Sequence, residues 1–552
     1  MGWILIGILS TIIQLGVIVG IVVLIVKLVS GKGKDKQKTT SESAGTMARR
    51  LFVYSIMITM LILVGIGIAG LIDAALPRSG QIVDSSAAAL PIAFVVVGLP
   101  VYLGLARYTL KRFATDPTEQ TSAGWAFYLT VALIGSLLTT MALAGDTLSS
   151  VVEGDGVDRT TVIHLIIWGG IWVGHWIASQ RWKSERSTSL HLLLGSAAGL
   201  IWAFSGAIAT LTAVFSTVYD ELFLDTLTGA TIDDLLRPAM ILVVGLPVWW
   251  WYWTRHARTV DRTPLWHAYV LLLGVLGGAV SVIIGAGIVL FSVLVWFLGN
   301  DGGSASGHFS MLPGALAAIA AGGVVWMYHG RILGGRTERE RTEVDRVYDY
   351  LLAAAGLLVA AGGLTTLLVT ILKSIYGGPG ITDSGGEILA TAITLLVVGA
   401  PLWWNYWRTI QRYRTDDAPS ELGSATRRIY IVGLFGIAAI TAVITLIIIV
   451  FVFFEDLLES SFGKNTIDSS SAAIALLLTA AAVAWYHFTV FREDRAEELP
   501  EPEPVVEEAE PGVDIVPEGA LEAAIHALNA GGKGQVLVTS TDDGFRVEPT
   551  ET

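Results

Sequence analysis

VVGLP at residues 96–100 recurs as VVGLP at 243–247 and as VVGAP at 397–401. Each copy lies in an apolar stretch, precedes a group of aromatic residues and ends in a proline, at Pro100, Pro247 and Pro401. These prolines are about 147 and 154 residues apart, and a motif that returns at such a regular spacing indicates internal repeats. The sequence therefore predicts a chain built by triplication, in which each proline kinks a helix about one turn from a membrane boundary.

The composition predicts a membrane protein. Of the 552 residues, 53% are hydrophobic and only 15% are charged, and the mean hydropathy is +0.64. A soluble globule of this length could not bury so much apolar surface. The chain contains no cysteine, which excludes disulfides, iron–sulfur clusters, cysteine nucleophiles and thiolate metal sites.

About thirteen apolar segments reach the roughly 20 residues that a helix needs to cross a bilayer. The first, at 1–30, is followed by a basic linker at 31–48, and positive charge on that side indicates an uncleaved anchor rather than a signal peptide. The other twelve pair into six hairpins, and two hairpins form one module. We therefore expect an all-α, polytopic transmembrane helix bundle with three tandem four-helix modules, at 49–186, 187–344 and 345–495.

The composition becomes acidic and proline-rich after the third module. Residues 496–517 are predicted to be a disordered linker, because such a segment cannot bury a core. Residues 518–552 follow with a predicted helix at 518–530 and a predicted hairpin within 535–547. A segment of about 35 residues is too small to fold without help, so we expect it to dock on a protein partner.

The basic residues predict the orientation. About 28 of the 35 lysines and arginines fall in loops on one side of the predicted bundle, and positive residues are retained on the cytoplasmic side. The loops on the other side are acidic. We therefore expect the N terminus outside and the C terminus in the cytoplasm.

Charged residues are absent from the middle third of every predicted span. This pattern argues against ion-coupled transporters, proton pumps and voltage sensors, which keep ionisable groups there for their function. No P-loop, HExxH or GxSxG motif occurs, and the basic loops are explained by topology rather than by nucleic-acid binding. We therefore expect no catalytic residues, no metal site and no enzymatic activity.

A tryptophan and a histidine recur near the end of the last helix of each module and are the candidate site for a cofactor. The pairs are Trp172 with His175, Trp326 with His329, and Trp485 with His487. A neutral imidazole at the same depth in each module could hold haem, another ring cofactor or a metal, or a lipid phosphate when protonated. The alternative is an aromatic belt, in which these side chains place their polar edges at the headgroups.

Aromatic clusters follow the second and third repeat prolines, at 249–253 and 403–407. They could form a flat cavity wall for a quinone, a sterol-like lipid or a carotenoid, with arginines beside them for cation–π pairing. The alternative is again an interface anchor.

Each repeat consists of an apolar hairpin with a Gly-x-Pro-aromatic helix and a second hairpin that ends in Trp and His. This unit resembles a bacterial family known only as a domain of unknown function in multi-pass membrane proteins. The resemblance covers residues 49–495 in three copies. The first copy departs from it with Tyr102 where the others have tryptophan, and the third because one residue rather than two separates Trp485 from His487. The resemblance implies a bacterial plasma membrane location and brings no activity with it.

Two classes of function remain. The first is a non-enzymatic scaffold or accessory subunit of a membrane complex, without a cofactor, which contacts membrane lipids and binds a protein partner through its acidic C-terminal tail. The alternative is a carrier or binder of a neutral or lipidic molecule, such as haem, a chlorin or a quinone, between the helices.

Overall fold

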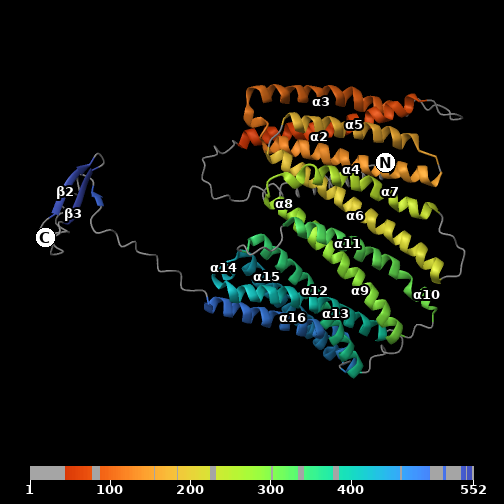
Figure 1. The fold of residues 1–552 in the computed structure, drawn as a ribbon, viewed down its shortest axis with the longest axis vertical. Coiled ribbons are helices and arrows are strands. Elements are labelled where there is room, and N and C mark those ends of the chain that lie inside the picture. The colour runs from red at the N-terminus through yellow and green to blue at the C-terminus, as the bar shows by residue number, and fades with distance from the viewer. Residues whose placement is uncertain are drawn as a thin grey trace. The chain divides into compact units, whose positions relative to one another are not determined.

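The computed structural model describes residues 44–76, 88–154, 156–182, 185–223, 232–299, 303–333, 341–376, 385–460, 463–497, 514–516, 536–541 and 544–549 (Figure 1). The predicted anchor at 1–30, most of the basic linker and the predicted helix at 518–530 lie outside these residues.

Among the described residues, twelve helices are long and apolar enough to cross a membrane. The expected fold class, an all-α polytopic membrane bundle, is confirmed. In the first module the helices are α2 (Ala44–Ala75), α3 (Ala89–Thr115), α4 (Ala123–Glu153) and α5 (Arg159–Arg181). The second module begins with α6 (Glu185–Phe223) and α7 (Ile232–Trp249), and α7 continues into the π-helical segment Trp250–Thr254. Next, α8 (Pro264–Ala268) continues through the π-helical segment Tyr269–Leu276 into α9 (Gly277–Leu298). The short helix α10 (Ala305–His308) and α11 (Leu312–Leu333) complete the module. In the third module the helices are α12 (Glu343–Tyr376), α13 (Gly385–Asp416), α14 (Ala418–Leu422), α15 (Ala425–Leu458) and α16 (Lys464–Glu497).

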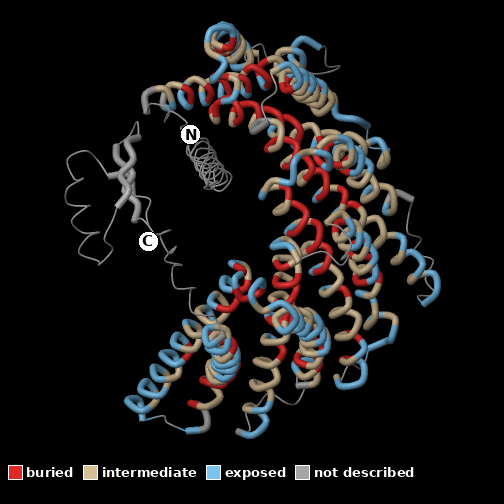
Figure 2. The backbone as a smooth tube through the Cα atoms, turned by 60° about the vertical axis from the view of Figure 1, so that its left-hand side comes forward, coloured by how far each residue is buried: buried red, intermediate tan, exposed pale blue. Residues whose placement is uncertain are grey.

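The helices of the first module pack as two hairpins. α2 lies against α3 and α4 lies against α5, while α2 also packs on α4 and α5 (Figure 1). Half of the most apolar stretch of α4 is buried, compared with 6% of that of α3. Figure 2 shows buried and exposed positions interspersed along the helices. α4 is therefore a core helix, whereas the other described helices cover little of the surface of α3.

The glycine of the repeated pentapeptide lets two helices touch backbone to backbone. A Cβ atom at Gly245 in α7 would overlap the amide nitrogen of Ala203 in α6, and one at Gly399 in α13 would overlap that of Ala360 in α12. In the first module the contact is looser, since a Cβ at Gly98 would lie 3.1 Å from a methyl carbon of Val64. The motif is therefore a site of close helix crossing as well as a proline position.

A buried ionic cluster closes the basic end of the first module. Glu119, in the short 3-10 turn Pro117–Glu119, is 2% exposed and accepts from Arg49 Nη2 at 2.8 Å, from Arg50 Nε at 3.1 Å and from the Tyr54 hydroxyl at 3.1 Å. Burial alone would raise the pKa of the Glu119 carboxyl, but the hydrogen bonds and charges of the two arginines outweigh it and hold that pKa below its usual value of 4.5.

This cluster predicts a loss of stability in acid. A carboxyl group whose folded-state pKa is lowered contributes stability that is complete above its unfolded pKa, near 4.5, and that disappears as the pH falls through the folded-state value. The stability difference between wild type and Glu119→Gln should therefore be large at pH 7 and should shrink below pH 4.5. The denaturant midpoints of both proteins in detergent at pH 7 and pH 3.5 measure this stability difference. If the difference is the same at both pH values, the ionised Glu119 carboxylate does not stabilise the fold.

The chain divides into two compact units, residues 1–411 with 444–479 and residues 412–443 with 480–552. In the second unit, Asp494 accepts from Arg427 Nε at 2.7 Å and from Arg414 Nε at 3.0 Å, and Arg427 is 1% exposed. This ion pair holds the start of α15 to the end of α16.

The second unit also holds a three-stranded antiparallel sheet in the order β1-β3-β2. Its strands are β1 (Asp514–Val516), β2 (Val536–Thr541) and β3 (Gly544–Pro549). β2 and β3 pair from Thr541 and Gly544 outward, in the region predicted to form a hairpin. The prediction of a disordered linker through 517 was wrong at its end, because β1 lies there and pairs with β3. Composition did not reveal it, because a strand this short gains its hydrogen bonds from a partner about 30 residues away in sequence.

Candidate functional site

The three predicted histidines have one geometry. His175, His329 and His487 are buried, and the Nδ1 atom of each lies within 2.9 Å of the carbonyl oxygen four residues earlier, at Ile171, Val325 and Val483 respectively. A carbonyl oxygen only accepts, so Nδ1 carries the proton. In the neutral imidazole, Nε2 is then a hydrogen-bond acceptor that faces away from its own helix backbone.

A tyrosine that was not predicted from the sequence lies beside each histidine. The ring centroids of Tyr128 and His175 are 5.7 Å apart, those of Tyr269 and His329 are 5.7 Å apart, and those of Tyr430 and His487 are 5.9 Å apart. A signal was present in the sequence, because each tyrosine stands six residues after the side chain that caps its helix, at Ser122, Thr263 and Ser424. The repeat therefore contains a Tyr–His pair as well as a Trp and a His.

The pair extends into a hydrogen-bonded chain in the first module. The Tyr128 hydroxyl lies 2.9 Å from His175 Nε2 and 2.9 Å from the Tyr102 hydroxyl. Since Nε2 accepts, Tyr128 donates to His175 and Tyr102 donates to Tyr128. In the second module Trp249 Nε1 donates to the Tyr269 hydroxyl at 2.9 Å. Tyr102 and Trp249 both stand two residues after the repeat proline. Although Tyr102 replaces the tryptophan of the other repeats, it still supplies a hydrogen-bond donor to the tyrosine beside the histidine.

A cavity of about 320 Å³ adjoins this chain in the first module. It lies between α2, α3, α4 and α5 toward their basic ends, and Leu110, which lines it, is 44% exposed, so the cavity reaches the protein surface. Its lining contains no charged side chain: Met57, Tyr102, Ala106, Thr109, Leu110, Phe113, Trp125, Tyr128, Ile171, Gly174, His175, Ala178 and Trp182.

Two polar groups of this lining lack a good partner. Trp125 is 4% exposed, and its indole N–H has no hydrogen-bond acceptor among the described residues. The buried Thr109 hydroxyl reaches the thioether sulfur of Met57 at 3.6 Å, and a thioether is a weak acceptor. A buried donor without an acceptor is costly, so the cavity is suited to a molecule that brings an acceptor oxygen.

The histidine of the second module is enclosed by protein instead. His329 is 1% exposed, and a Cβ atom at Gly274 would overlap its ring. The rings of Trp253 and Tyr328 lie 5.9 Å and 5.0 Å from it. Its Nε2 atom has no hydrogen-bond partner among the described residues.

The tryptophans predicted to share these sites have another role in two modules. Trp172 Nε1 donates to the hydroxyl of Tyr252 at 2.8 Å, and Trp326 Nε1 donates to that of Tyr348 at 3.2 Å. Each tyrosine belongs to the following module. Trp485, in the last module, is 73% exposed. Trp172 and Trp326 therefore join successive modules, and none of the three lines the cavity.

The repeat prolines lie inside α3, α7 and α13, at Pro100, Pro247 and Pro401. After Pro247 the α-helix gives way to the π-helical segment Trp250–Thr254, and a second π-helical segment runs from Tyr269 to Leu276. π-helical turns are frequent at functional sites, and these two supply Trp253, Tyr269 and Gly274 to the surroundings of His329.

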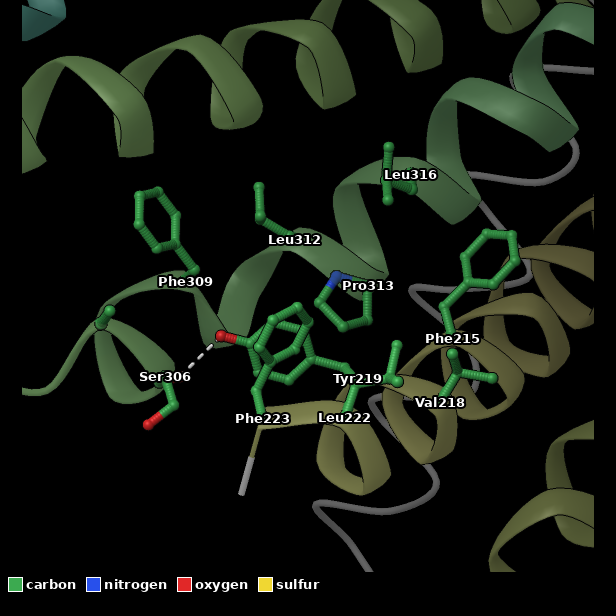
Figure 3. Close-up of a pocket in the computed structure, with 11 residues that line it drawn as sticks. Phe215, Val218, Tyr219, Leu222, Phe223, Ser306, Phe309, Leu312, Pro313 and Leu316 are labelled. Carbon is green, nitrogen blue, oxygen red and sulfur yellow. Dashed lines mark hydrogen bonds between the residues drawn. The ribbon is translucent and has the colours of Figure 1, made fainter. Parts of the chain in front are cut away.

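A second cavity of about 380 Å³ lies toward the acidic ends of the helices (Figure 3). Figure 3 shows side chains of α6 opposite those of α11 and the turn before it, and the Tyr219 hydroxyl donates to the Ser306 carbonyl oxygen at 2.8 Å. The lining is otherwise apolar: Phe215, Val218, Leu222, Phe223, Ala305, Phe309, Leu312, Pro313 and Leu316. It can accommodate hydrocarbon but contains no free polar side chain to orient a ligand.

Comparison with known proteins identifies the repeats. The model of a family described as Domain of unknown function (DUF5671) matches residues 50–163, 189–324 and 346–487, one segment in each predicted module. No curated protein and no solved structure matches the chain. Since the three matched segments cover well over half of the sequence, the chain belongs to the DUF5671 family, in three tandem copies.

Proposed function

We propose that this multi-pass membrane protein is a non-enzymatic binder of a neutral, lipid-soluble molecule, which it holds in the cavity of the first module. The single observation that carries the proposal is that cavity, with its uncharged aromatic walls and two buried donors, Trp125 Nε1 and the Thr109 hydroxyl, that lack a good acceptor. Its volume of about 320 Å³ is at the lower end of the range for small-molecule sites.

The lining selects the chemistry of the ligand. A charged ligand would lose its hydration without gaining a counter-ion, because the walls contain no ionised side chain. An apolar body with one acceptor oxygen would satisfy the Trp125 N–H or the Thr109 hydroxyl. Haem is a poor candidate, because the His175 Nε2 atom that would coordinate iron already accepts from Tyr128.

Filling the cavity should abolish ligand retention. Ala106 lines the cavity, so Ala106→Trp introduces an indole where the ligand would lie. Protein purified gently from its native membrane should carry a stoichiometric small molecule in native mass spectrometry, and Ala106→Trp should not. The matched control is Leu103→Trp on the exposed side of the same helix, where the original side chain is 55% exposed. If Ala106→Trp retains as much of the small molecule as wild type does, the proposal is wrong.

A second candidate function is a scaffold or accessory subunit in the bacterial plasma membrane, with the N terminus outside and the C terminus in the cytoplasm. The sheet of β1, β2 and β3 favours it, because three paired strands form an ordered element after the acidic segment that could dock on a protein. Deleting residues 498–552 should release a co-purifying polypeptide and leave the small molecule in place. A chain that retains the same partner without its tail would contradict this function.

A further inference from the structure

We propose that the ligand of the first module is a neutral, planar ring compound with a carbonyl oxygen, and that it replaces the Trp–Tyr pair that the second module supplies from its own sequence. The inference rests on the proposed function, because it names the class of molecule that the same cavity holds.

At two positions the first module has a small residue where the other two modules have a large aromatic one. The sixth residue after the repeat proline is Ala106 in the first module, Trp253 in the second and Trp407 in the third. The residue before the repeated histidine is Gly174 in the first module, Tyr328 in the second and Tyr486 in the third. Ala106 and Gly174 both line the cavity. The space therefore adjoins two positions at which the first module has a small residue and the other two modules have a large aromatic one.

The second module shows what can fill this position. Trp253 is fully buried, and its ring centroid lies 4.6 Å from that of Tyr269, 5.9 Å from that of Trp266 and 5.9 Å from that of His329. Its indole N–H donates to the Tyr328 hydroxyl at 3.1 Å. A flat aromatic system thus packs beside the Tyr–His pair and is oriented by one hydrogen bond.

The corresponding rings line the cavity in the first module. Trp125 and Tyr128 stand three and six residues after the capping serine, as Trp266 and Tyr269 follow Thr263, and both line the cavity together with His175. The Trp125 and Tyr128 rings are stacked, with centroids 5.4 Å apart. A planar ring could pack on them as Trp253 packs on Trp266 and Tyr269, whereas an acyl chain would fill the volume without the aromatic contacts.

The hydrogen-bonding groups specify the oxygen. Tyr102 and Tyr128 use their protons within the chain that ends at His175. The Trp125 N–H and the Thr109 hydroxyl remain, and both are donors. The ligand must therefore supply an acceptor, and a ring carbonyl, as in a quinone or a related bicyclic ketone, supplies one without adding charge.

The test compares three probes on the delipidated full-length protein in detergent: 1,4-naphthoquinone as a planar ring with carbonyls, naphthalene as the ring alone, and n-decanol as a flexible chain. The chain has no cysteine that the quinone could alkylate. Dissociation constants come from titration calorimetry and from the shift in denaturation temperature. We expect naphthoquinone to bind at least 10-fold more tightly than naphthalene or decanol.

The matched variant transplants the aromatic pair of the second module. Ala106→Trp with Gly174→Tyr should abolish the binding of all three probes. Its denaturation temperature without probe, at or above that of wild type, shows that it folds. Trp125→Phe keeps the ring without the N–H and should reduce the preference of naphthoquinone over naphthalene by about 10-fold, the loss of one buried hydrogen bond.

The two proposals fail in different ways. If decanol binds wild type as tightly as naphthoquinone does and the double variant abolishes both, the cavity is a binding site but its ligand is not a planar ring. If no probe distinguishes wild type from the double variant, and wild type carries no retained molecule, both proposals are wrong. If Trp125→Phe prefers naphthoquinone over naphthalene as strongly as wild type does, the Trp125 N–H does not bind the carbonyl oxygen.

Discussion

Glu119→Ala should lower the free energy of unfolding by about 3–5 kcal/mol, the usual loss when one partner of a buried ion pair is removed. Glu119 is 2% exposed, and Arg50, which donates to it at 3.1 Å, is 6% exposed. The substitution removes the carboxylate that also accepts from Arg49 and Tyr54, which leaves their positive charge and hydroxyl near a low-dielectric interior. The denaturant midpoint of the detergent-solubilised protein at neutral pH measures the effect.

A matched ion pair at the acidic end of the bundle is the control. Arg237 Nε lies 3.0 Å from Glu153 Oε1, but the Arg237 side chain is 71% exposed, so Glu153→Ala should cost less than about 1 kcal/mol. If the two alanine variants lose the same stability, the cluster around Glu119 does not behave as a buried network. Glu119→Gln should fall between wild type and Glu119→Ala at neutral pH, because the amide oxygen can still accept from one arginine.

The sequence was sufficient for the architecture because the strongest signals were long and repeated. Twelve apolar segments, each long enough to cross a bilayer as a helix, determine the fold class. The pentapeptides around Gly98, Gly245 and Gly399 show which residues of the three repeats are equivalent. The structure adds the reason for the glycine, which is close backbone approach and could not be read from one helix alone.

The candidate site was harder to predict, because its groups lie on different helices. The repetition of His175, His329 and His487 pointed to three equivalent positions, but their tyrosine partners are 47 to 60 residues away in sequence. The choice of Trp172 and Trp326 as site residues depended on their closeness to the histidines along the helix. A residue three positions before another on a helix points in a different direction by about 60°, which is enough for these indoles to reach the next module instead.

The aromatic clusters illustrate the same limit. Both sequence interpretations of 249–253, a cavity wall and an interface anchor, treated the cluster as one surface. In the structure Trp250 is 46% exposed and Trp253 is fully buried, so the residues of the π-helical segment do not form one surface. Hydropathy does not distinguish an indole that faces lipid from one that fills a core, so the contrast between Trp253 and Ala106 could be interpreted only with coordinates.

Gly245→Leu should prevent stable folding of the second module. A single added carbon at Gly245 would already overlap the backbone of Ala203, and backbone in a packed helix cannot move aside as a flexible side chain can. α6 and α7 would have to separate along a crossing that Gly199 and Gly206 also bring into backbone contact. We expect a loss of more than about 3 kcal/mol, at or beyond the upper end of the usual cost of overpacking. Size-exclusion chromatography in detergent and the denaturation temperature report it.

Gly104→Leu is the control that separates crowding from the insertion of a larger residue into a membrane helix. Gly104 lies in α3, six residues beyond the glycine of the first pentapeptide, and a Cβ atom there would have no neighbour within 4 Å. Leucine favours the helix over glycine by somewhat less than about 1 kcal/mol, so this variant should be as stable as wild type or slightly more stable. The two substitutions should therefore act in opposite directions although they exchange the same residues. If Gly245→Leu also folds with wild-type stability, α6 and α7 do not cross at that glycine, and the role assigned to the repeated pentapeptide is wrong.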